Sequence, residues 1–87
     1  MKITAELSVY PLRDNFTDAV LGFIDELLVN EDIVAVTNSI STQISGEDDA
    51  VFRAIQGALR ASYDRFGRQV LVAKFIPKHF ADIGPEG

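Results

Sequence analysis

Apolar and polar residues alternate along the first segment of the chain. From Lys2 to Tyr10, every second residue is apolar, beginning at Ile3. A period of two is typical of a β-strand that buries one of its faces. Pro11 follows directly, and we expect it to end the strand because it lacks a backbone N–H.

The apolar spacing then changes to that of a helix. Asn15 stands at a helix N-cap position, and apolar residues recur every three or four positions up to Val29. The pattern therefore predicts a helix over residues 16–29, ending in the polar residues 30–32.

A hairpin and a second helix are predicted next. Residues 33–37 are mostly β-branched, and residues 40–45 alternate again, so we expect two strands joined by a turn at Asn38-Ser39. The second helix is expected to begin at Ser45 or Gly46 and to end at Gly67. Its expected apolar stripe consists of six residues: Val51, Phe52, Ile55, Leu59, Tyr63 and Phe66.

The last strand is predicted over residues 70–76 and ends before Pro77. Both alternating sets of its side chains are largely apolar, so we expect both of its faces to be covered, most simply by a second subunit. Four phenylalanines are expected in the core: Phe16, Phe23, Phe52 and Phe66.

The predicted order of elements is β-α-β-β-α-β, which is typical of the ferredoxin-like split βαβ fold of the α+β class. We expect one domain over residues 1–80, with a flexible tail over residues 81–87. The expected sheet is antiparallel with strand order 4-1-3-2, and both helices cover one face while the other face stays open.

The open face is expected to carry the polar residues of the central strands. If Ile3, Ala5, Leu7 and Val9 point toward the helices, Glu6, Ser8 and Tyr10 line the open face. In the same way, Ser41, Gln43 and Ser45 would join them from the third strand. Ser8 and Tyr10 are expected to neighbour Ser41 and Gln43, with Glu6 further along. A bulge at Asn38-Ser39 would instead put Thr42 on the open face.

Composition narrows the classes of partner and chemistry. The 87 residues carry 8 Lys+Arg and 13 Asp+Glu, a net charge of −5, which disfavours nucleic acid and anionic membranes as partners. There is no cysteine, which excludes disulfides and thiol catalysis. No signal-peptide pattern or apolar run of ~20 residues is present, so we expect a cytoplasmic protein outside the membrane.

The usual catalytic and metal-binding patterns are missing from the sequence. His79 is the only histidine, and no acidic residue accompanies it at metal-ligand spacing. No Ser/His/Asp arrangement can be argued from it either. We therefore expect no metal, no cofactor and no enzymatic activity.

Three segments resemble the YkoF-type thiamine-binding family: residues 5–12 (AELSVYPL), 40–47 (ISTQISGE) and 70–76 (VLVAKFI). The resemblance implies a ferredoxin-like domain that binds thiamine or its hydroxymethylpyrimidine moiety, in thiamine salvage or transport. Larger members of this family carry two such domains, so a single-domain chain is expected to form a homodimer or homotetramer. The matching motifs imply five ligand-binding residues: Ser8, Tyr10, Ser41, Thr42 and Gln43. Glu6 is added on chemical grounds, because a carboxylate suits an aminopyrimidine edge or a thiazolium charge.

Two other functions remain open at the level of sequence. The chain could be a structural or regulatory oligomerisation module with no ligand, because this fold serves many functions. It could also be a small enzyme assembled at a subunit interface, with Glu6 or Asp14 as the acid or base.

Overall fold

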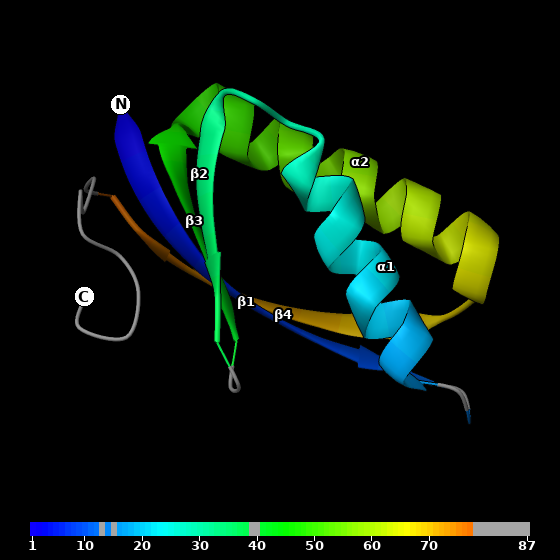
Figure 1. The fold of residues 1–87 in the computed structure, drawn as a ribbon. Helices are drawn as coiled ribbons and strands as arrows, with labels where there is room; N and C mark the ends of the chain where they lie inside the picture. Colours follow the sequence, from blue (N-terminus) through cyan, green and yellow to red (C-terminus); the bar gives the residue numbers. More distant parts are fainter. Residues whose placement is uncertain (13, 15, 39–40, 78–87) are drawn as a thin grey trace.

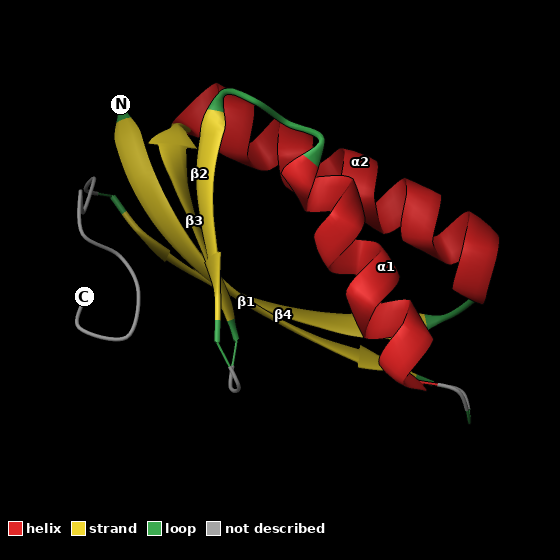
Figure 2. Ribbon diagram, in the orientation of Figure 1, coloured by secondary structure: helices red, strands yellow, loops and turns green. Residues whose placement is uncertain are grey.

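A computed structural model describes residues 1–12, 14, 16–38 and 41–77 of the chain. Its elements follow the order β1 (Lys2–Pro11), α1 (Phe16–Leu28), β2 (Ile33–Thr37), β3 (Thr42–Glu47), α2 (Asp48–Phe66) and β4 (Gln69–Ile76). The four strands form one antiparallel sheet in the order β2-β3-β1-β4, and both helices lie on the same side of it (Figures 1 and 2). The predicted ferredoxin-like fold and strand order are confirmed. His79 and the expected tail lie outside the described residues.

The core lies between the sheet and the two helices. β1 contributes Ile3, Ala5 and Leu7, which are all buried, and Val9 packs against them. Ile44 of β3 pairs with Ala5 and is also buried. The alternation of β1 therefore assigns its inward face correctly, because a period of two places these side chains on one side of the sheet.

The inward face of α2 differs from the predicted stripe. Its buried residues include a row of small side chains at a spacing of four: Ala50, Ala54, Ala58 and Ser62. Phe52 and Tyr63 are 53% and 59% exposed, and Phe16 of α1 is 57% exposed, so their predicted core positions are wrong. Small residues let the helix approach its neighbours closely, and the large rings then lie outside. Of the four phenylalanines, Phe23 is in the core.

Strand β3 lies two residues later in the chain than predicted. It continues through Gly46 to Glu47, because Gly46 pairs with Ile3 on one side and with Ile33 on the other. Helix α2 therefore starts at Asp48 and not at residue 45 or 46. A side chain at position 46 would place its Cβ 3.0 Å from the backbone oxygen of Asp32, which explains the glycine.

The first residue of the chain caps the N-terminal end of α2. The backbone oxygen of Met1 accepts a hydrogen bond from the N–H of Asp48 at 2.9 Å. The Met1 amine donates to Glu47 at 3.2 Å and lies 3.5 Å from Asp48. Met1 therefore satisfies one of the N–H groups that a helix leaves unpaired at its start.

These contacts predict a pH-dependent stability. The hydrogen bond to Glu47 raises the pKa of the Met1 amine above its ordinary value of 8.0, and the charge of Asp48 adds to the effect. A raised pKa stabilises the folded state below pH 8, and this stabilisation is lost as the pH rises through the folded-state pKa. The free energy of unfolding, measured in urea, should therefore be higher for the free-amine protein than for the N-acetylated protein at neutral pH. The two values should become equal at alkaline pH. A constant difference across this range would contradict the prediction.

Candidate functional site

A gap between β1 and β3 sets the position of the site. Strand β1 pairs with β4 as far as Pro11, but its pairing with β3 ends at Leu7 and Thr42. The β2–β3 hairpin turns back at this point, where the N–H of Asn38 donates to the oxygen of Ser41 at 3.0 Å. Within the described chain, residues 8–10 of β1 therefore have a strand partner on one side alone. We call this gap, at residues 8–10, the notch.

A cavity of about 150 Å³ lies at the notch. Helix α1 closes it with Val20, Phe23 and Ile24, and β1 adds Leu7 and Val9. Its other described lining residues carry polar side chains: Ser8, Tyr10, Thr37, Asn38, Ser41 and Thr42. The cavity thus combines an apolar wall with a few polar groups, as small-molecule sites commonly do.

The end of the hairpin holds the polar wall in place. The hydroxyls of Thr37 and Thr42 lie 3.0 Å apart and share a hydrogen bond in which either group can be the donor. The side-chain oxygen of Asn38 accepts from the N–H of Ser41 at 3.0 Å. Asparagine is favoured in such turns because its side chain replaces a backbone acceptor.

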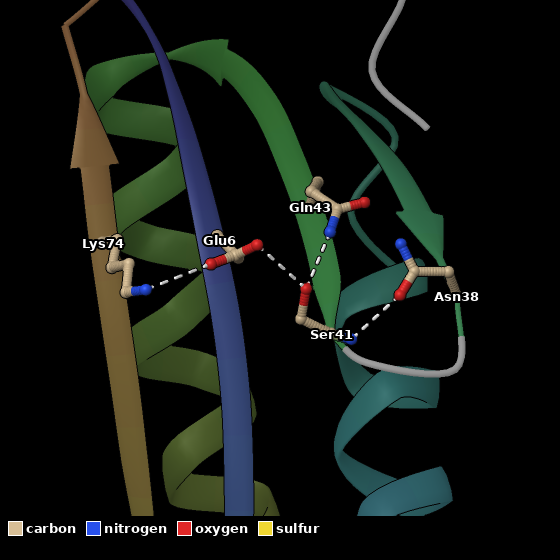
Figure 3. A network of polar contacts seen from close by, with 5 residues as sticks. All are labelled: Glu6, Asn38, Ser41, Gln43 and Lys74. Carbon is tan, nitrogen blue, oxygen red and sulfur yellow. Dashed lines mark hydrogen bonds and ion pairs between the residues drawn. The ribbon is translucent and has the colours of Figure 1, made fainter. Parts of the chain in front are cut away.

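A chain of polar contacts crosses the open face of the sheet beside the cavity (Figure 3). Lys74 Nζ of β4 lies 3.7 Å from Glu6 Oε1 of β1. Ser41 Oγ donates to Glu6 Oε2 at 3.2 Å, and Gln43 Nε2 donates to Ser41 Oγ at 2.7 Å. We call these four residues the Glu6–Ser41 network. Because Ser41 also lines the cavity, the network reaches its wall.

The six residues predicted for the site fall into two connected groups. Ser8, Tyr10, Ser41 and Thr42 line the cavity. Glu6 and Gln43 do not line it but bond to Ser41.

The arrangement differs from the predicted pairing in one respect, and it decides between the two predicted orientations of β3. Glu6, and not Ser8 or Tyr10, lies opposite Gln43. Thr42 pairs with the buried Leu7, so it is on the helix side of the sheet and the alternative with a bulge is wrong.

Sequence reasoning missed three residues of this region: Thr37, Asn38 and Lys74. Asn38 was expected only as part of a turn. Lys74 is the one charged residue of β4, and its side chain shares the open face with Glu6 because the two are directly paired. The charge pattern alone could have marked Lys74, but its partner depends on the register between strands that are far apart in sequence.

The arrangement can bind a small, flat, partly polar group. Hydroxyls at the wall can donate or accept hydrogen bonds, while the side chains of α1 contact the faces of a ring. In the described part of the chain, no three acidic or histidine side chains lie close enough to hold a metal ion. No helix there is long and apolar enough to cross a membrane.

Solved structures with the same fold include proteins from three bacteria. A Streptococcus pneumoniae protein matches with a TM-score of 0.83 and 22% identity, over 95% of this chain and 93% of that one. A Thermotoga maritima protein, provisionally named a thiamine biosynthesis/salvage protein, matches with a TM-score of 0.78 and 16% identity, over 90% and 85%. A Bacillus cereus domain of unknown function matches with a TM-score of 0.76 and 17% identity, over 99% and 85%. At these identities the similarity concerns the fold.

Sequence comparison identifies the family. No curated protein matches the chain. The model of the YKOF-related family, however, matches residues 2–72, which include every strand and helix as far as the first half of β4. The chain therefore belongs to the YKOF-related family.

Proposed function

We propose that this chain binds thiamine or its hydroxymethylpyrimidine moiety without catalysing a reaction, as a homo-oligomer in cytoplasmic thiamine salvage or transport. The family and the thiamine-related name of one structural neighbour support a thiamine-related role. The observation that carries the proposal is the cavity at the notch, which four of the six predicted residues line.

The size of the cavity favours the pyrimidine ring as the part that enters it. A cavity of about 150 Å³ corresponds to one six-membered ring, since an apolar cavity of about this volume accommodates benzene. The thiazolium ring of thiamine would then remain outside, where the net charge of −5 favours a cation. Glu6 is only half-buried, so its carboxylate is available on the open face.

Isothermal titration with three compounds tests the proposal: thiamine, hydroxymethylpyrimidine and the isolated thiazole alcohol. We expect saturable binding of the first two with similar affinity and no binding of the third, because the cavity holds the ring that the first two share. Circular dichroism and thermal unfolding on the same sample establish that the protein is folded. A folded protein that binds neither pyrimidine compound would overturn the proposal.

The proposed homo-oligomer is supported by β4. None of the eight residues of this edge strand is buried, and Val72 and Phe75, which lie on its opposite faces, are both more than 40% exposed. A long, apolar, unpaired edge is a site for pairing with another strand. With Ala73 on a twofold axis, Leu71 of one copy would lie opposite Phe75 of the other. Val72 would lie opposite Lys74 on the open face, so the backbone and the apolar row on the helix side are self-complementary.

The Val72→Lys variant is expected to dissociate the oligomer. A charge on the paired edge would have to be desolvated, and lysine protects exposed edge strands in monomeric proteins. Light scattering should give a multiple of 9.6 kDa for the wild-type chain and about 9.6 kDa for the variant. Val34→Lys, on the opposite edge strand β2, is the matched control and should keep the oligomer. A monomeric wild-type protein would contradict the prediction.

A further inference from the structure

The hydroxyl of Ser41 donates its single hydrogen to Glu6. A carboxylate oxygen only accepts hydrogen bonds, so Ser41 Oγ must be the donor in its 3.2 Å contact with Glu6 Oε2. Gln43 Nε2 occupies one lone pair of the same oxygen at 2.7 Å. A serine hydroxyl has one hydrogen and two lone pairs. One lone pair is therefore the only hydrogen-bonding capacity that Ser41 Oγ retains.

The amide of Gln43 cannot reverse without breaking this arrangement. Rotation by half a turn would bring its oxygen against Ser41 Oγ, whose hydrogen already points to Glu6. Two acceptors would then face each other at 2.7 Å. In the observed orientation, Gln43 Oε1 is buried and has no hydrogen-bond partner within the described part of the chain. Ser41 and Gln43 thus both have acceptor capacity left, and Ser41 has no donor left.

The other hydroxyls of the cavity are not fixed in this way. Thr37 and Thr42 share a hydrogen bond whose direction can reverse. Such groups adapt to a donor or to an acceptor on the ligand and do not discriminate between them. Ser41 lines the same cavity, but any polar group that reaches its hydroxyl must be a donor.

We propose that the Glu6–Ser41 network makes the site selective for ligands that direct a hydrogen-bond donor at Ser41, so that a 4-aminopyrimidine is preferred to its 4-oxo analogue, in which an oxygen replaces the amino group. This inference rests on the proposed function. An oxo group in place of the amino group would put an oxygen against the remaining Ser41 lone pair and leave both unsatisfied. The loss of such a buried contact corresponds to a preference of about 10- to 100-fold for the amino compound.

The test compares hydroxymethylpyrimidine with its 4-oxo analogue by titration calorimetry. The wild-type protein should prefer the amino compound by about 10- to 100-fold. In Glu6→Gln, the new amide can donate to Ser41 Oγ, which frees the hydroxyl hydrogen of Ser41. The ratio of the affinities for the amino and oxo compounds should therefore fall toward one. Glu31→Gln makes the same change of charge at an exposed position after α1 and should keep the preference. Ser41→Ala removes the hydroxyl itself and should also abolish the preference.

Each outcome separates the two proposals. If the folded wild-type protein binds neither compound, the proposed function fails and the selectivity fails with it. If it binds both compounds equally, only the selectivity is overturned. If the wild-type protein shows the preference and both Glu6→Gln and Ser41→Ala retain it, the assignment to the Glu6–Ser41 network is overturned.

Discussion

The Ile24→Trp variant is expected to bind hydroxymethylpyrimidine roughly a hundredfold more weakly than the wild-type protein, a loss of about 2.7 kcal/mol. Ile24 is a half-buried residue of α1 that lines the cavity. An indole at this position would occupy space that the pyrimidine ring needs. Ile24 takes no part in the Glu6–Ser41 network, so the hydrogen bonds of the network should persist.

Leu28→Trp is the matched control for this variant. Leu28 lies one turn further along the same helix and is 57% exposed, so its replacement leaves the cavity unchanged. Titration calorimetry should give wild-type affinity for Leu28→Trp and strongly reduced affinity for Ile24→Trp, with both proteins folded by circular dichroism. Wild-type affinity in a folded Ile24→Trp protein would show that the ligand binds elsewhere.

The Gly22→Ala variant is expected to lower the free energy of unfolding by about 1–2 kcal/mol. A Cβ at this position of α1 would overlap Cε2 of Phe66 at the end of α2, so the ring must move. The Arg65 guanidinium, 4.7 Å from the centre of that ring, must move with it. Alanine would gain about 1 kcal/mol of helix propensity, which offsets part of the cost of the displaced ring.

The same substitution at Gly57 of α2, Gly57→Ala, is expected to stabilise the protein. Among the residues that the structure describes, no atom outside the adjoining helix backbone lies within 4 Å of the Cβ that would be added there. The gain in helix propensity should therefore stabilise the protein by about 0.5–1 kcal/mol. Urea unfolding should give a free energy of unfolding below the wild-type value for Gly22→Ala and above it for Gly57→Ala. Two shifts of the same sign would show that Phe66 does not restrict position 22.

The elements of the fold could be predicted because their signals are local. Nine alternating residues are enough to define β1 and its buried face, and Gly67 marks the end of α2. Its φ of 83° is a conformation that favours glycine, and its N–H bonds to the oxygen of Tyr63. The buried face of α2 was predicted only in part, because Val51 and Ile55 of the expected stripe are buried but Phe52 and Tyr63 are exposed. Hydrophobicity favours Phe52 and Tyr63, whereas close packing selected alanines and Ser62.

The site could be predicted only in part, because it depends on register. The open face and its polar residues follow from alternation within β1 and β3. The pairing of Glu6 with Gln43 and with Lys74 depends on how strands 37 and 68 positions apart align, which no local pattern specifies. The cavity has the same origin, since it results from where the β2–β3 hairpin turns relative to β1.

The length of this hairpin also sets the size of the cavity at the notch. Three further residues in each strand would extend β3 by about 10 Å, enough to pair with residues 8–10 of β1 and fill the notch. A shorter hairpin would widen the opening toward α1. Hairpin tips tolerate insertions and deletions because little else depends on them. Related chains could thus acquire sites for larger or smaller molecules while the core between sheet and helices stays the same.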